Sequence, residues 1–273
     1  MKTIFKLSMK CSISSVGILS GILEQIFKIL EPVGAMELVY EGKAKRVYAR
    51  GDRLVLVFKD EVTAFDGARR DAAQSKGELA ARLSALLFEY LRGVGVENHF
   101  LAQVGPNALE VVKTQLIPLE VIVRFKAYGS YLRRMPHVRP LQPFKRPVAE
   151  LHLKDDRLHD PLILPQDAVE GGLAAEEELE AMSNTALRAA EALRSLYGSA
   201  GCDFVDVKFE FGRVGGRLLL IDEISGDTFR VLCGGEHLDK EYYRKTGDAA
   251  GLVQRYRALL ELTEKALRQR PSS

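Results

Sequence analysis

The chain has 273 residues, of which 47% are hydrophobic and 28% charged, and its formal net charge is +2. This length can bury the core of one large or two small domains. The nearly balanced charge leaves no general electrostatic case for binding nucleic acid or a membrane surface. Three widely spaced cysteines, an odd number, predict a reducing compartment and no disulfide framework.

The first 35 residues differ from the rest of the chain. Lysines precede the apolar run SISSVGILSGILEQIFKIL, which superficially resembles a signal peptide or a membrane anchor. Glu24 and Lys28 interrupt the run, no small-residue cleavage site follows it, and it is short for a spanning helix. An amphipathic helix is one interpretation. We favour another, in which translation begins at Met36 and the N-terminal extension, residues 1–35, is not part of the protein.

The next segments predict an antiparallel sheet followed by a helix. The pieces ELVYEG, AKRVYAR and RLVLVFKD read as strands, with turns at Gly42 and Gly51. Apolar spacing predicts a helix from about Ser75 to Gly93. Short strands are expected at 98–100 and 109–112, and the apolar run LIPLEVIVRFKAY predicts a central strand.

The second half mixes loops, helices and one marked hairpin. Four of the ten prolines lie between Pro136 and Pro147, which predicts a loop. Helices are expected at 174–197, with Gly198 as the C-cap, and at 248–268. Strands mixed unevenly with a few helices indicate an α+β fold.

The hairpin CDFVDVKFEFGRVGGRLLLIDEISGDTFR alternates apolar and charged residues. Its apolar positions point to one face of the strand: Val205, Val207, Phe209 and Phe211. Its charged positions point to the other: Asp206, Lys208 and Glu210. A turn at Gly215-Gly216 brings Asp222 and Glu223 to within roughly 5–8 Å of these charges. The pattern suits a Mg²⁺-phosphate site, although a solvated strand face has the same pattern.

Two further motifs carry positive charge. In YEGKAKRVY, a glycine turn with Lys43 and Lys45 allows phosphate binding, and the next strand delivers Lys59. This layout resembles the nucleotide-covering lobe of protein kinases and lacks P-loop spacing; a solvated basic hairpin is the alternative. In RFKAYGSYLRR, Arg124 and Ser130 can hold a phosphate or a carboxylate. A basic surface loop or a nucleic-acid patch are the alternatives there, although no nucleic-acid module is present.

In chain order, eight segments resemble the successive blocks of the SAICAR synthetase family. They are YEGKAKRVY, FKDEVTAFDG, SKGELAARLSALLFEYL, PLEVIVRFKAYGSYLRR, KDDRLHDPLI, DFVDVKFEFG, DEISGDTFR and LDKEYYRKTGD. The resemblance covers nearly everything from Met36 to about residue 265. It implies a SAICAR synthase-like α+β fold. A small antiparallel lobe resembling the kinase N-lobe, residues 36–118, would cover a larger α+β lobe, residues 119–273, with ATP in the cleft.

The resemblance implies a cytoplasmic, ATP- and Mg²⁺-dependent ligase of purine biosynthesis. It would join the carboxylate of carboxyaminoimidazole ribotide to the amine of L-aspartate, giving SAICAR, ADP and phosphate. These small molecules are its expected partners, with no nucleic acid or membrane, and a homo-oligomer is possible. One alternative is a divergent paralogue that ligates another carboxylate and amine. The other is a kinase-like phosphotransferase, disfavoured by the missing His-Arg-Asp and Asp-Phe-Gly motifs.

The resemblance also assigns roles to individual residues. The ATP-binding residues would be Gly42, Lys43, Ala44, Lys45 and Lys59. The Mg²⁺ ligands would be Glu210 and Asp222, and the catalytic residues would be Lys208, Asp206 and Asp227. The substrate-binding residues would be Arg124, Ser130, Arg230, Asp66 and Asp160. Departures from the family pattern border the expected substrate pocket: Ala80, Ala81, Phe125, Lys126, Gly226 and Val231.

Overall fold

The first strands form an antiparallel sheet because short apolar segments are separated by glycine turns. In the computed structural model, which describes residues 36–64 and 69–269, this sheet has the order β1-β2-β3-β7-β6. Its strands are β1 (Glu37–Glu41), β2 (Lys45–Arg50), β3 (Arg53–Phe58), β6 (Phe100–Gly105) and β7 (Ala108–Val112). Gly51 turns β2 into β3 with φ +62°, a conformation that favours glycine. The extension 1–35 and Asp66 lie outside the described residues.

A second antiparallel sheet has the order β13-β12-β10-β8-β9, and β11 pairs with β10. Its strands are β8 (Gln115–Lys126), β9 (Pro143–Leu153), β10 (Cys202–Val214), β11 (Arg217–Ile221), β12 (Phe229–Cys233) and β13 (Glu236–His237). A separate pair is formed by β4 (Glu61–Ala64) and β5 (Arg69–Ala72). The predicted central strand is confirmed as β8, which lies between β10 and β9.

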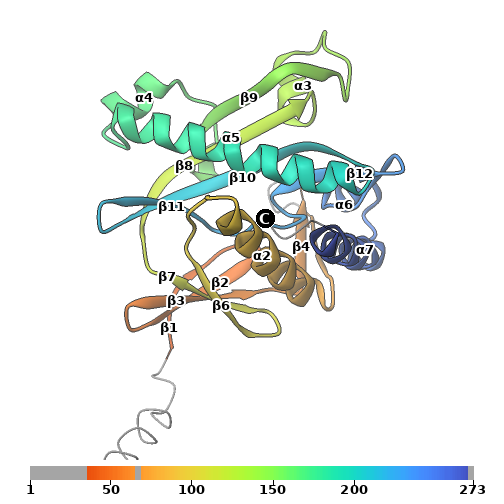
Figure 1. Cartoon of the computed structure of the whole chain (residues 1–273), viewed down its shortest axis with the longest axis horizontal. Coiled ribbons are helices and arrows are strands. Elements are labelled where there is room, and N and C mark those ends of the chain that lie inside the picture. The colour runs from red at the N-terminus through yellow and green to blue at the C-terminus, as the bar shows by residue number, and fades with distance from the viewer. Residues whose placement is uncertain (1–35, 65–68, 270–273) are drawn as a thin grey trace, which may run out of the picture. The chain divides into compact units, whose positions relative to one another are not determined.

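Helices cover the sheets and complete the core. They are α2 (Lys76–Gly93), α3 (Ser130–Arg134), α4 (Pro165–Glu170), α5 (Glu176–Ser199), α6 (Glu241–Thr246) and α7 (Ala249–Arg268). The long helix α5 runs along one face of the second sheet, over β8 and β10 (Figure 1). Leu193 and Tyr197 of α5, Val123 of β8 and Phe209 of β10 are buried in the same core cluster. The α+β fold class is therefore confirmed, and α5 leaves the other face of this sheet to polar side chains.

The predicted hairpin is confirmed as β10 and β11. Gly215 and Gly216 connect the strands with φ +54° and +72°, which suits a two-residue turn that needs a left-handed backbone at both positions. Glu210 lies opposite Ile221, so Asp222 comes directly after the cross-strand partner of Glu210. The hairpin thus brings these carboxylates together as its sequence predicts.

The predicted alternation of core-facing and charged residues along β10 is wrong at Val205. A register shift between Phe204 and Asp206 interrupts the pairing of β10 with β12. Such a bulge adds one residue to a strand and moves the preceding side chains to the other face. Phe204 therefore joins the main core, whereas Val205 packs with Tyr128 and Leu232 in a small separate cluster.

Two predicted boundaries are also wrong. The prolines between Pro136 and Pro147 do not all lie in a loop, because β9 begins at Pro143. Strand β9 is at the edge of its sheet, where a residue without an N–H is tolerated. Helix α5 continues past Gly198 to Ser199, and Gly201, with φ +75°, is the glycine that leaves it.

The prediction of no disulfide is wrong as well. Cys202 of β10 lies directly opposite Cys233 of β12, their Cα atoms are 4.4 Å apart, and the two residues form a disulfide. The residues are 31 positions apart, so sheet pairing and not local sequence brings them together. The odd number of cysteines suggested no pairing, but two of the three form this disulfide. The third is Cys11, which lies outside the described residues.

Both sheets belong to one compact unit, Leu38–Ser273. The division at residue 118 into two lobes, and the likeness of the first lobe to a kinase, stay predictions. Within residues 36–64 and 69–269, no helix is long and apolar enough to cross a membrane.

Candidate active site

The face of β10 opposite α5 carries a dense set of paired charges. We call this set the lysine–carboxylate cluster, and its members are Lys45, Lys154, Lys208, Glu120, Glu210, Asp222 and Glu223. Lys208 Nζ lies 2.8 Å from Glu120 Oε1 and 2.6 Å from Glu210 Oε1. Lys154 Nζ lies 2.7 Å from the same oxygen of Glu210. One carboxylate is thus shared by two ammonium groups.

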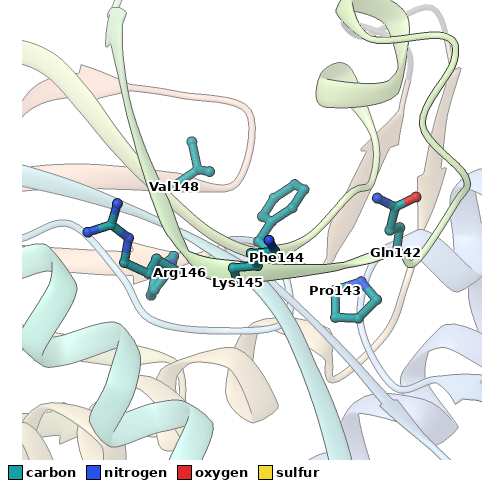
Figure 2. Close-up of a pocket in the computed structure, with 7 residues that line it drawn as sticks. Gln142, Pro143, Phe144, Lys145, Arg146 and Val148 are labelled. Atoms are coloured by element: carbon teal, nitrogen blue, oxygen red, sulfur yellow. The ribbon is translucent and has the colours of Figure 1, made fainter.

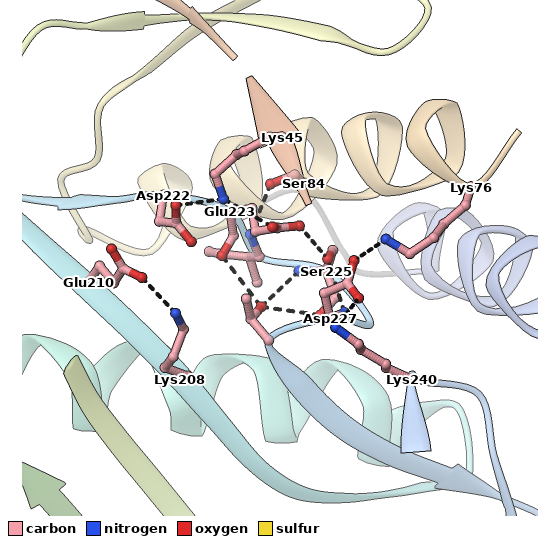
Figure 3. A network of polar contacts seen from close by, with 12 residues as sticks. Lys45, Lys76, Ser84, Lys208, Glu210, Asp222, Glu223, Ser225, Asp227 and Lys240 are labelled. Atoms are coloured by element: carbon pink, nitrogen blue, oxygen red, sulfur yellow. Dashed lines mark hydrogen bonds and ion pairs between the residues drawn. The ribbon is translucent and has the colours of Figure 1, made fainter. Parts of the chain in front are cut away.

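Lys45 links the first sheet to this cluster. Its Nζ lies 2.6 Å from Asp222 Oδ1 and 3.0 Å from Glu223 Oε1 (Figure 3). Burial alone would lower the pKa of Lys45, but Asp222 and Glu223 outweigh it and raise that pKa above its ordinary value. Burial alone would raise the pKa of Asp222, but Lys45 and Lys208 lower it below its ordinary value. Lys45 and Asp222 are therefore both charged at neutral pH.

Asp222 has a left-handed backbone conformation that few non-glycine residues adopt. Its φ is +74°, in the left-handed region, where a non-glycine residue costs about 1–3 kcal/mol unless its surroundings hold it there. Its carbonyl oxygen lies 3.1 Å from Nε2 of His99. Burial lowers the pKa of His99 to about 4, so the ring is neutral at pH 7. Because a carbonyl can only accept, Nε2 carries the hydrogen.

Asp227 lies beside the cluster and not within it. Its carboxylate forms an ion pair with the buried Lys76, and Lys240 Nζ lies 3.4 Å from its Oδ1. Ser225 connects it to the cluster, since the hydroxyl donates to Glu223 Oε2 at 2.7 Å and accepts from the Asp227 amide at 3.1 Å. Figure 3 shows this continuous polar network.

A second group of charges, the arginine pair of Arg124 and Arg230, is arranged around Asp206. The Asp206 carboxylate accepts from Arg124 at 2.8 Å and from Arg230 at 2.8 and 3.0 Å. Arg124 also donates to Ser130 Oγ at 2.8 Å and lies 2.9 Å from Glu150. The Arg124 side chain is 2% exposed and that of Arg230 is 18% exposed. Of the two guanidinium groups, that of Arg230 is therefore the more accessible to a ligand.

The loop before α3 is shaped to admit Arg230. Gly129 has φ +56°, and a Cβ added there would lie 2.9 Å from a guanidinium nitrogen of Arg230. The guanidinium also lies 5.2 Å from the centre of the Tyr128 ring. The backbone conformation therefore favours glycine at position 129, and a Cβ there would displace the Arg230 guanidinium.

In the glycine turn between β1 and β2, Lys59 stabilises the backbone. The Gly42 amide donates to the Lys45 carbonyl at 2.9 Å. Lys59 Nζ lies 2.6 Å from Glu41 and donates to the Gly42 carbonyl at 3.0 Å, and its amide donates to the Ala44 carbonyl at 2.9 Å. The ammonium of Lys59 is therefore already used to hold the turn.

The KDDRLHDP segment lies next to this turn. The ammonium of Lys43, which is half-exposed, lies 2.9 Å from Asp156 Oδ1. Asp160 accepts from the Asp155 amide at 3.0 Å, and its carbonyl accepts from His152 at 2.8 Å. Asp160 therefore shapes its own loop, whereas Lys154 of the same motif reaches the cluster.

The structure thus brings part of the predicted residues together in three groups, whereas Lys43, Lys59 and Asp160 have their contacts elsewhere. Lys45, Lys208, Glu210 and Asp222 share one cluster, the arginines share Asp206, and Asp227 is joined through Ser225. Sequence reasoning assigned no role to Glu120 or Lys154, whereas it placed Glu223 beside the charges of the hairpin, where the structure has it. Glu120 had a signal, since it is the charged residue within the apolar run LIPLEVIV, residues 116–123.

Two cavities in the described part of the chain lie away from these groups. A cavity of about 680 Å³ is lined by residues 142–148 at the start of β9 (Figure 2). A second cavity, of about 260 Å³, is lined in part by Lys126, Arg194 and Cys202. Neither of these two cavities is lined by a residue of the lysine–carboxylate cluster.

The donor set of the cluster fits Mg²⁺ only if a ligand supplies further oxygens. Among residues 36–64 and 69–269, no three His, Cys, Asp or Glu side chains are placed to hold a metal ion by themselves. Mg²⁺ is usually held by one or two carboxylates together with phosphate oxygens and water. Glu210 and Asp222, which face lysines suited to phosphates, match that arrangement.

Comparison with known proteins gives consistent results. A family model described as SAICAR synthetase matches residues 38–258. A phosphoribosylaminoimidazole-succinocarboxamide synthase from Pyrobaculum calidifontis is 68% identical over 86% of this chain and 98% of its own length. Its counterpart from Caldivirga maquilingensis is 48% identical over 83% and 95%. A solved SAICAR synthetase in complex with ADP has a TM-score of 0.80 and 35% identity, covering 87% of this chain and all of the other.

The fold and these matches define the class of the protein as a ligase of purine biosynthesis. The family match extends over most of the described residues, and several relatives exceed 30% identity over more than four-fifths of the chain. The chain belongs to the SAICAR synthetase family.

Proposed function

We propose that this chain joins carboxyaminoimidazole ribotide to L-aspartate through an amide, with ATP converted to ADP and phosphate. The names of its relatives and the ADP complex of a related structure support this reaction. One observation of the chain itself carries the proposal: Lys208 of the lysine–carboxylate cluster and Asp206, which holds the arginine pair, lie two positions apart on β10. A nucleotide site at the cluster and a phosphate site at the arginine pair would therefore lie next to each other along the same strand.

The lysine–carboxylate cluster would hold the nucleotide. Lys45 and Lys208 would donate to phosphate oxygens, and the amides of the Gly42–Ala44 turn would approach them from the first sheet. Glu210 and Asp222 would hold Mg²⁺, which neutralises phosphate charge when it is bound. The ion pairs already present, at 2.6–3.0 Å, gather these side chains in one place.

The arginine pair would bind the phosphate of the ribotide. Arg230 is partly exposed, and Ser130 adds a hydroxyl next to Arg124. Asp206 would keep the two guanidinium groups in place, which is a positioning role. Charge-assisted bonds from arginine to phosphate are among the stronger polar contacts.

The chemistry needs positioning and charge stabilisation more than a protein nucleophile. A carboxylate is a poor electrophile, and transfer of a phosphoryl group to its oxygen creates a leaving group. The amine of L-aspartate can then form the new C–N bond while the C–O bond to phosphate breaks. Lys208, held between Glu120 and Glu210, would stabilise the charge that develops during transfer.

The test is ADP release from the full-length chain with Mg-ATP and carboxyaminoimidazole ribotide, with and without L-aspartate. Turnover that requires all three substrates supports the ligase. ADP release without L-aspartate would point to a phosphotransferase, and nucleotide binding without turnover would point to a paralogue with another substrate pair. Cytoplasmic location and a homo-oligomeric state belong to the same proposal, and size-exclusion chromatography would test the latter.

A further inference from the structure

A short segment that precedes β6 lies against the strand that ends before Asp222. The Leu220 amide donates to the Glu97 carbonyl at 3.1 Å, and the His99 amide donates to the Leu220 carbonyl at 3.0 Å. Asn98 and Leu220 form a parallel bridge. Together with the contact from His99 Nε2 to the Asp222 carbonyl at 3.1 Å, these bonds fix the end of β11 against the first sheet.

The His99 ring is held firmly in place. It is 4% exposed, and its ring packs edge-on against Phe88, with centroids 5.3 Å apart and planes at 64°. The side-chain Nδ2 of the neighbouring Asn98 donates to the Phe88 carbonyl at 3.0 Å, which ties the segment to α2. The ring therefore presents Nε2–H to a single acceptor, the Asp222 carbonyl.

The Asp222 backbone needs such a partner. Its left-handed φ of +74° is one that aspartate adopts only at selected positions. In this conformation its carboxylate reaches Lys45, at 2.6 Å, inside the lysine–carboxylate cluster. On the far side of the turn, the Ile224 amide donates to Ser84 Oγ of α2 at 2.9 Å. Helix α2 and the segment before β6 thus hold both sides of the turn that carries Asp222.

We propose that His99 is a positioning residue, whose Nε2–H holds the Asp222 backbone so that its carboxylate faces the metal-nucleotide. The inference rests on the proposed function, in which Asp222 is a ligand of Mg²⁺. His99 itself touches neither nucleotide nor metal. Its loss should therefore weaken the metal-dependent part of nucleotide binding and leave the metal-independent part unchanged.

The test is a matched pair of substitutions in the full-length chain. In His99→Gln the amide nitrogen can occupy the place of Nε2, whereas in His99→Asn it reaches only the place of Nδ1. We measure ADP binding by calorimetry with Mg²⁺ and again with EDTA. His99→Asn should weaken Mg-ADP binding about tenfold, within the range for partners of metal ligands, and leave ADP binding in EDTA unchanged. His99→Gln should retain most of the wild-type affinity.

The controls separate positioning from stability and from the proposed function. His137→Asn, at an exposed position, should leave ADP affinity unchanged both with Mg²⁺ and with EDTA. Wild-type Mg-ADP affinity in His99→Asn would overturn the inference, as would an equal loss in both variants or an equal loss with and without Mg²⁺. Asp222→Asn tolerates the same backbone conformation but removes the charge. If it binds Mg-ADP like the wild type, the metal role of Asp222 fails, whatever His99 does.

Discussion

The disulfide between Cys202 and Cys233 should contribute measurably to stability. It joins β10 to β12 and closes a loop of 31 positions that contains Asp206, Lys208, Glu210, Asp222 and Arg230. The perturbation is Cys233→Ala, at a half-buried position where little packing is lost. A cross-link of this kind acts mainly by limiting the unfolded chain, because the open loop would otherwise gain conformational freedom.

The loop length sets the expected magnitude. On the chain-entropy relation, a loop of about 30 residues corresponds to about 3.7 kcal/mol at 25 °C. For a folded unit of this size, 1 kcal/mol corresponds to roughly 2–4 °C in melting temperature. The Cys233→Ala variant should therefore melt about 7–15 °C below the oxidised wild type.

Calorimetry with and without a thiol reductant provides the assay. The reduced wild type should melt at nearly the same temperature as Cys233→Ala, and the variant itself should not respond to reductant. Cys11→Ala is the matched control, and it should keep both the melting temperature and the response of the wild type. Three titratable thiols in the unfolded, unreduced wild type would refute the reasoning, as would equal melting temperatures in the two redox states.

Three further substitutions test the site and its electrostatics. Lys208→Ala should lower turnover about 100-fold or more, because a donor to the transferring group is lost, and Lys113→Ala, at an exposed position, should not. Arg230→Ala should raise the KM for the ribotide about tenfold or more with little change in kcat, whereas exposed Arg188→Ala should leave it unchanged. Burial alone would raise the pKa of Glu150, but the His152 hydrogen bond and the Arg124 charge lower it to about 2. Since its ordinary value is 4.5, the stability contributed by this carboxylate is complete above pH 4.5 and is lost as the pH falls towards 2.

The outcomes that contradict these expectations are specific. Wild-type turnover in Lys208→Ala would remove that lysine from the reacting groups. An unchanged ribotide KM in Arg230→Ala would remove the arginine from phosphate binding. In urea unfolding, the free energy of unfolding of Glu150→Gln should be lower than that of the wild type. The difference should be largest at pH 7 and disappear near pH 2. A difference in the free energy of unfolding that does not depend on pH would mean that the charge of Glu150 does not stabilise the fold.

The local sequence was sufficient to predict those structural features that depend only on residues close together along the chain. The β10–β11 hairpin followed from alternation and a two-glycine turn, so the proximity of Glu210 and Asp222 was predictable. Helix α2 and the central strand β8 followed from apolar spacing. The bulge before Asp206 was not predictable, because it depends on pairing with β12 and not on the residues of β10 alone.

The sequence by itself determined the α+β class, the main helices and strands, the family, and the residue types that gather on β10. Only the tertiary structure decided which charges meet. Lys45 and Glu223 are 178 positions apart, and Cys202 meets Cys233 only because β12 pairs with β10. The left-handed backbone of Asp222 and its contact with His99 likewise appear only in the folded chain. The physical reason is that periodicity encodes which face of an element is buried, whereas the order of strands in a sheet is set by long-range packing that no local pattern contains.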